Sequence, residues 1–148
     1  MTKSEILKFF DAQPTMSLTT MNGAVPETRA MNNIRNPKMA RHLKKYFRDN
    51  DRILISTNTS SDKVAQIRKN PAANIYVFDK NFNGLLLNGK IREVTDDETR
   101  NALWTFSWNM FYPGGRDGGD YTVLEFIPET YKSYRGFGFV KTNGKIKQ

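Results

Sequence analysis

The stretch TNTSSDK, residues 57–63, holds the residue types in this chain that are best suited to binding an anion. It follows the apolar segment RILIST and precedes an amphipathic segment, so we expect it to join a strand to a helix. The groups best placed to contact an anion are the hydroxyls of Thr57, Ser60 and Ser61 and the ammonium of Lys63. These groups and the free amides of a first helical turn can converge on a phosphate. Simple capping of the helix by Ser60 or Ser61 is the alternative.

Most other catalytic arrangements are absent from the sequence. The chain contains no cysteine, which excludes disulfides, thiol catalysis and zinc thiolate sites. Its single histidine, His42, lies in a segment rich in lysine and arginine, which is typical of a surface helix. The acidic residues follow no metal-binding motif, and no phosphate-binding glycine loop ending in lysine occurs. We therefore predict no catalytic side chain and no metal site, and any chemistry would come from a cofactor.

The stretch RGFGFV, residues 135–140, resembles the signature strand of an RNA-recognition motif. In that domain a helix and a further strand follow the signature, but only KTNGKIKQ remains here. The sequence therefore favours packing or pocket-lining roles for Tyr134, Phe137 and Phe139, with single-stranded nucleic-acid binding as an alternative.

Length and composition predict one domain. The chain has 148 residues and a net charge of +8, with lysine and arginine scattered along it. A positive balance favours anionic ligands. The N-terminal segment MTKSEILKFFDAQ predicts an amphipathic helix with a capping box of Thr2 and Glu5, not a secretory signal. We expect a single domain over residues 1–148, a cytoplasmic location, and neither membrane nor nucleic acid as partner.

Hairpins dominate the first two thirds of the predicted elements. Strands are expected at 15–21 and 24–34 around an Asn22-Gly23 turn, at 52–57, and at 74–79 and 85–94 around an Asn83-Gly84 turn. Helices are expected where Met39, Leu43 and Phe47 recur at helical spacing, and from Ser60 or Ser61 to just before Pro71.

The last third adds a helix and two strands. A second capping box, Thr95 with Glu98, predicts a helix that extends through Trp104 and Trp108. A glycine-rich loop follows, and then strands at YTVLEFIP and TYKSYRGFGF. Because strands outnumber helices and most neighbours are hairpins, the fold class is mainly β (α+β), an antiparallel barrel or sandwich with peripheral helices.

The order of these parts resembles the pyridoxamine 5′-phosphate oxidase-like family of FMN-binding split barrels, and within it the short general-stress-protein-26 and nitroimidazole-reductase-like members. The most specific stretch is TNTSSDKVAQIRKNP, and TMSLTTMNGAVPETRAM, LNGKIREVTDDETRNALW and FYPGG with DYTVLEFIPETY are also similar. The resemblance implies a Greek-key-like split β-barrel and a homodimer with FMN at its interface.

The resemblance also implies site residues. Arg29 would help to hold the FMN phosphate, and Ala30, Met31 and Asn32 would run beside the flavin ring, mainly through backbone groups. Contacts to the ring edge and the phosphate would come from Thr57, Ser61 and Lys63. The aromatic residues implied to close the site from the second protomer are Trp104, Trp108, Phe111 and Tyr112.

Four departures from the family pattern bear on the substrate. Asp62 replaces an arginine, Ile34 replaces a substrate-binding lysine, Gly84 replaces a glutamine beside the flavin, and the C-terminal Arg-x-His has no counterpart. These departures disfavour true vitamin B6 oxidation. We expect an FMN-dependent oxidoreductase that transfers electrons from a reduced nicotinamide to an unidentified small acceptor. A non-catalytic stress-response module that binds flavin, deazaflavin or haem is the alternative.

Overall fold

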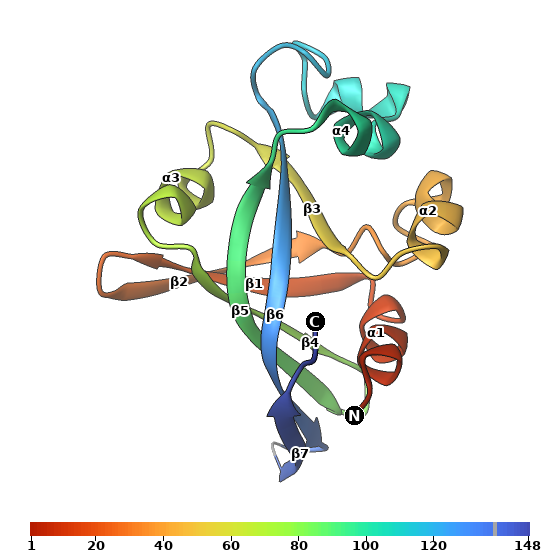
Figure 1. Ribbon diagram of the computed structural model, residues 1–148, viewed down its shortest axis with the longest axis vertical. Helices are drawn as coiled ribbons and strands as arrows, with labels where there is room; N and C mark the ends of the chain where they lie inside the picture. Colours follow the sequence, from red (N-terminus) through yellow and green to blue (C-terminus); the bar gives the residue numbers. More distant parts are fainter. Residues whose placement is uncertain (138) are drawn as a thin grey trace.

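A computed structural model describes residues 1–137 and 139–148, and it contains an antiparallel sheet of seven strands (Figure 1). The strand order is β2-β1-β4-β5-β6-β3, and β7 pairs with β6 outside this path. The strands are β1 Thr15–Asn22, β2 Val25–Asn32, β3 Ile53–Asn58, β4 Ala72–Phe78, β5 Gly84–Val94, β6 Tyr121–Arg135 and β7 Phe139–Lys145. Within the described residues no ladder joins the two end strands, β2 and β3, so the barrel is split between them. The predicted mainly β split barrel is confirmed.

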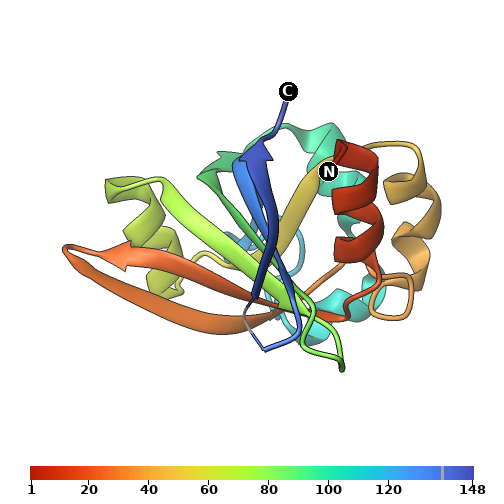
Figure 2. The same ribbon diagram turned by 90° about the horizontal axis from the view of Figure 1, so that it is seen from below.

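Short helices surround the sheet. They are α1 Lys3–Asp11, α2 Lys44–Arg48, α3 Asp62–Lys69 and α4 Asp97–Leu103, with 3-10 turns η1 Arg41–Leu43 and η2 Phe106–Met110. Figure 2 shows α1 and α2 on one flank and α3 on the other, beside the β1–β2 hairpin. The predicted capping box of α1 is confirmed, because Thr2 Oγ1 accepts from the Glu5 amide and Glu5 Oε2 accepts from the Thr2 amide.

Two hydrophobic clusters form the core, one on each face of the sheet. Ile53 and Ile55 of β3 belong to the cluster that also contains Phe10 of α1. Leu54, which lies between them in sequence, belongs to the cluster that contains Leu103 of α4. Neighbouring residues of a strand point to opposite faces, so one strand contributes to both clusters. Burial of the second cluster holds α2 and α4 against the outer face of the barrel.

Both hairpin turns differ from the predicted positions. In the first hairpin Asn22 pairs with Val25, so the two loop residues are Gly23 and Ala24. Gly23 has a φ of +60°, a backbone conformation that glycine adopts without steric cost. The second turn spans residues 79–83, because the Asp79 carboxylate accepts hydrogen bonds from the amides of Asn81 and Asn83. The predicted two-residue Asn83-Gly84 loop is therefore wrong.

Two helix predictions also need correction. Met39, Leu43 and Phe47 do not share one helix: η1 precedes a short α2, and Met39 is exposed while the other two are buried. The N-cap of α4 is Asp96, whose carboxylate accepts from the Thr99 amide, so the predicted capping box does not form. The helix ends at Leu103 and does not continue through the tryptophans.

The RGFGFV stretch does not form one strand, and its residue 138 lies outside the described residues. The two predicted C-terminal strands up to Arg135 are a single strand, β6, and the chain then turns at Gly136 and Phe137, both with positive φ, to return as β7. The signature strand of an RNA-recognition motif is therefore not present. Phe137 and Phe139 are 87% and 70% exposed, so neither is buried in the core, and Phe137 packs on the exposed ring of Phe82, whereas Tyr134 lines a cavity as predicted.

Candidate functional site

A groove of about 440 Å³ lies at the split of the barrel. Its walls are the ends of β2 and β3, Lys63 of α3, and the segment around η2. Eight of the residues implied by the resemblance line it: Ala30, Met31, Asn32, Thr57, Lys63, Trp108, Phe111 and Tyr112. The fold thus brings together residues from four separate parts of the chain.

The edge of β2 offers backbone groups to this groove. Met31 pairs with Met16 of β1, and β2 has no strand partner on its other side among the described residues. An unpaired strand edge presents a row of amide donors and carbonyl acceptors. Ala30, Met31 and Asn32 can therefore hydrogen bond to a planar ligand lying along this edge, whatever their side chains are.

Lys63 supplies a positive charge to the groove. Its Nζ donates to Thr57 Oγ1 at 3.0 Å, and Thr57 is buried. The pKa of Lys63 lies below its usual 10.5, mainly because of burial and secondly because of the nearby charge of Arg29, while Asp62 opposes the shift. A partly desolvated ammonium beside a second cation is stabilised by a bound anion. This end of the groove is therefore suited to a phosphate.

Arg29 lies beside this end but outside the lining of the groove. Its Nη1 donates to Thr20 Oγ1 at 2.6 Å, and its Nη2 donates to Gln66 Oε1 at 3.2 Å. Both partners are buried, so the guanidinium is held between β1 and α3. A guanidinium has five N–H groups. Three hydrogen bonds occur within the described residues, which leaves donors for a phosphate.

The predicted serine contacts do not converge on the groove. Ser61 is the N-cap residue of α3, but its Oγ donates to the Asn58 carbonyl at 2.7 Å and makes no capping bond. The Ser60 amide donates to the Asp120 carboxylate at 3.0 Å. Hydrogen bonds from Asn58 and then Ser60 lower the pKa of Asp120. The carboxylate that orders this turn comes from a distant segment, so no local sequence signal identified it.

An aromatic wall closes one side of the groove. Trp108, Phe111 and Tyr112 line it within the same chain. Tyr112 is buried, and burial raises the pKa of its hydroxyl. Trp104 does not line the groove, and its ring packs on Tyr121 with centroids 5.0 Å apart. Trp104 therefore contributes to the second hydrophobic cluster.

Six further residues line the groove: Thr15, Ile34, Met39, Ala40, Ser56 and Asn58. Ile34 stands where the resemblance implies a substrate-binding lysine, and the other five were not predicted. Two of them had a usable signal. Ser56 and Asn58 flank Thr57 at the end of β3, where polar residues follow an apolar strand. Thr15 lies opposite Asn32 in the β1–β2 ladder, and this pairing depends on the turn that was predicted one residue too early.

The described residues include no group of three or more His, Cys, Asp or Glu side chains that could hold a metal ion. None of the described helices has the length and apolar character needed to cross a membrane.

A family model identifies the family of this chain. The model described as pyridoxamine 5′-phosphate oxidase matches residues 2–135. The chain belongs to the pyridoxamine 5′-phosphate oxidase family. The suspected relationship is thereby confirmed. A search of curated proteins gave no match.

Solved structures agree with this assignment. A Clostridium acetobutylicum protein related to general stress protein 26 has a TM-score of 0.74 and 25% identity, over 99% of this chain and 97% of that one. General stress protein 26 from Bacillus anthracis has a TM-score of 0.70 and 16% identity, over 97% and 98% of the two chains. A haem-binding protein from Mycobacterium smegmatis has a TM-score of 0.67 and 12% identity, over 98% of this chain and 58% of that one. The last two show a shared fold alone.

Proposed function

We propose that the groove binds FMN and that the protein is an FMN-dependent oxidoreductase, which transfers electrons from a reduced nicotinamide to a small acceptor. The observation that carries this proposal is the arrangement of one groove with a positive end, an unpaired strand edge and an aromatic wall. Its volume of about 440 Å³ lies within the range of cofactor sites.

Each part of the groove matches one part of FMN. Lys63 and Arg29 would neutralise the phosphate, with the Thr57 hydroxyl holding the ammonium in place. The edge of β2 would bond to the polar edge of the ring, and Trp108 and Tyr112 would exclude water from it. A bound flavin supplies the hydride and single-electron chemistry.

The chain itself binds and orients its ligands. Lys63 and Tyr112 are the titratable residues among those that line the groove. Burial raises the pKa of Tyr112 above 10, so this hydroxyl stays protonated at neutral pH. No acid or base is assigned, and turnover would depend on the geometry in which the groove holds its ligands.

We also propose a homodimer in the cytoplasm. Three large apolar side chains in and next to η2 are exposed beside the groove: Phe106, Met110 and Phe111. Apolar side chains gathered beside a binding groove are typical of a protein interface. A second copy covering them would also seclude the flavin. Sedimentation velocity of the purified protein should give twice the mass of one chain, and a monomer at micromolar concentration would contradict the dimer.

The function is tested by colour and by reduction. The purified protein should be yellow or should take up added FMN, and NADH or NADPH added without oxygen should bleach the flavin. A colourless protein that fails to take up FMN would refute the proposal. Titration of the Lys63→Ala variant separates the groove from other surfaces, because its affinity for FMN should fall.

The second candidate is a module that binds flavin, deazaflavin or haem without turnover. The shared fold of the haem-binding protein from Mycobacterium smegmatis favours testing it. The ring of His42 packs edge-on against Trp108, but its Nε2 lies 3.0 Å from the Leu103 carbonyl and the residue does not line the groove. Haem is therefore a less well supported ligand for this module than flavin or deazaflavin. A bound flavin that neither nicotinamide reduces would favour this candidate over the enzyme.

A further inference from the structure

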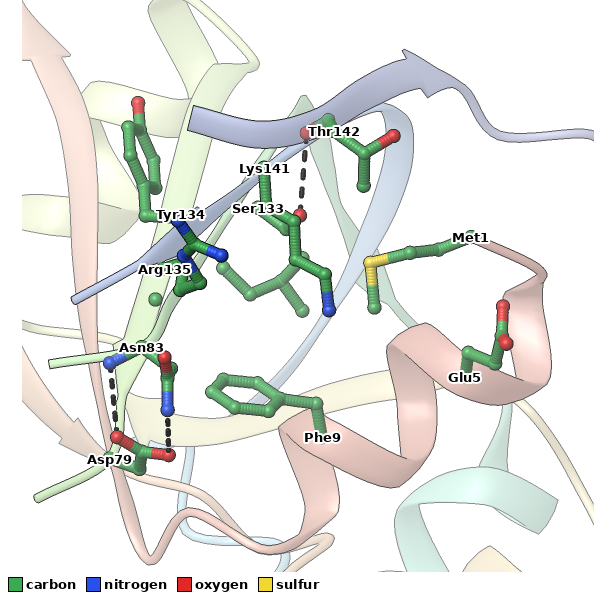
Figure 3. Close-up of a pocket in the computed structure, with 12 residues that line it drawn as sticks. Met1, Glu5, Phe9, Asp79, Asn83, Ser133, Tyr134, Arg135, Lys141 and Thr142 are labelled. Carbon is green, nitrogen blue, oxygen red and sulfur yellow. Dashed lines mark hydrogen bonds between the residues drawn. The ribbon is translucent and has the colours of Figure 1, made fainter. Parts of the chain in front are cut away.

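A second cavity, of about 540 Å³, lies between α1, the β4–β5 turn, β6 and β7 (Figure 3). It shares no lining residue with the groove at the split. Met1, Phe9 and Leu85 give it apolar walls, and Arg135 and Lys141 carry cations into its lining. Figure 3 shows the Lys141 side chain ending in the space between Phe9 and the sulfur of Met1.

The two acidic residues of this cavity are engaged in local structure. Glu5 accepts from the Thr2 amide in the capping box, and this hydrogen bond is the main reason that the pKa of Glu5 is lowered. Asp79 accepts from Asn83 Nδ2 at 2.9 Å and also from the amides of its own turn. Neither carboxylate contacts a cation of the cavity.

The two cations have no such partner. Within residues 1–137 and 139–148, the side chains of Arg135 and Lys141 take part in no ion pair and no hydrogen bond. Two positive charges without an ion-pair partner beside an apolar wall favour a ligand that combines a negative group with an apolar body, although Glu5 is close enough to interact electrostatically with Lys141.

The turns that carry this cavity are fixed to each other. The Gly136 amide donates to Asn83 Oδ1 at 3.3 Å, and the rings of Phe82 and Phe137 stack with centroids 5.6 Å apart. Both phenylalanines have positive φ, of 60° and 48°, which is unfavourable for a bulky residue. Strained residues persist where the surrounding structure holds them, and they concentrate at binding sites. The stacked rings and the hydrogen bond thus hold together the two turns, one of which follows Arg135 directly.

We propose that this cavity binds an organic acid with an apolar body. Its carboxylate would lie between Arg135 and Lys141, and its apolar part would contact Phe9, Leu85 and Met1. The volume is within the range for small-molecule sites. No bond is made or broken at this site, and it is independent of the flavin groove.

Displacement of a fluorescent anion tests this inference. Anilinonaphthalene sulfonate is titrated into the FMN-saturated protein, and decanoate or decanol is then added. Decanoate should displace the probe, whereas decanol, which has the same chain length but no charge, should displace it at least about tenfold less effectively. Equal displacement by the two compounds would show that the cations do not recognise the ligand, and absence of probe binding would overturn the site altogether.

Paired variants locate the site. Combining Arg135→Gln with Lys141→Gln should weaken decanoate binding at least about tenfold. The control combines Lys145→Gln with Lys147→Gln, which removes the same charge from exposed residues outside the cavity lining, and decanoate binding should change little. Equal weakening in both variants would contradict the proposal. FMN affinity should be unchanged in both, so failure here is distinguishable from failure of the flavin groove.

Discussion

Replacing Lys63 with methionine tests the groove most directly. The substitution removes the ammonium while keeping a long side chain that can fill the same space. A hydrogen bond to a charged group contributes about 1.5–3 kcal/mol, so losing one to the phosphate should weaken FMN binding by about 10- to 150-fold. Titration followed by quenching of flavin fluorescence measures this change, because Trp108 lies in the same groove.

The structure also predicts how Lys63→Met should affect the stability of the ligand-free protein. Burial and the charge of Arg29 lower the pKa of Lys63, so the folded state is destabilised by carrying its charge. The substitution relieves that cost but removes the bond to Thr57 Oγ1. Because the two effects oppose each other, the melting temperature without FMN should change little. A large loss of affinity would then reflect lost contact and not unfolding.

The control is Lys69→Met, which removes the same charge from an exposed position in the last turn of the same helix. It lies outside the groove lining and should leave FMN affinity within about threefold of the wild type. Equal losses in the two variants would mean that only the overall charge attracts FMN. That result would refute the idea that Lys63 contacts the phosphate.

The affinity for FMN should also depend on pH in a defined direction. In the free protein the pKa of Lys63 lies below 10.5, and a bound phosphate dianion would raise it. Above the second pKa of the phosphate, affinity is therefore full while the pH stays below the lowered pKa of Lys63, and it falls as the pH rises through that pKa. The Lys63→Met variant should lack this alkaline decline, and an unchanged decline would assign it to another group.

The remaining predictions concern stability. Burial raises the pKa of Glu125, but the bonds from Arg52 and a second arginine outweigh it and lower the pKa overall. Glu125→Gln should cost about 2–4 kcal/mol in urea unfolding, a difference that disappears as the pH falls through the lowered pKa. A Cβ on Gly89 would lie 2.0 Å from the Ile127 carbonyl, so Gly89→Ala should cost about 3 kcal/mol. Gly23→Ala meets no atom within 4 Å and should cost about 1 kcal/mol through its positive φ, so the reverse order of melting temperatures would refute the steric argument.

Local patterns predicted much of this fold. The alternation of apolar and polar residues in strands such as β1, and the capping box of Thr2 and Glu5, depend on residues that lie near one another in sequence. The polar stretch after β3 was likewise recognised as a turn before a helix, and two of its groups, Thr57 and Lys63, do meet in the groove.

Competing local signals caused most of the errors. Thr95 and Asp96 are both suitable N-caps, and the carboxylate of Asp96 takes the position. At the second hairpin the Asp79 carboxylate organises a longer turn than Asn83-Gly84 alone would form. In each case the sequence does contain a cap or turn signal, but two nearby positions can supply it. The free energies of the two alternative caps or turns differ too little for a sequence pattern to separate them.

The class of fold, the family and the stretches that carry polar residues could be predicted from the sequence, because periodicity and short motifs are properties of adjacent residues. Which of those residues meet depends on the tertiary structure. It directs Arg29 toward Gln66, packs Trp104 against the second hydrophobic cluster, and has Asp120 order the turn after β3. Each of these outcomes depends on contacts between residues far apart in the chain, which follow from strand register and packing and leave no local trace in the sequence.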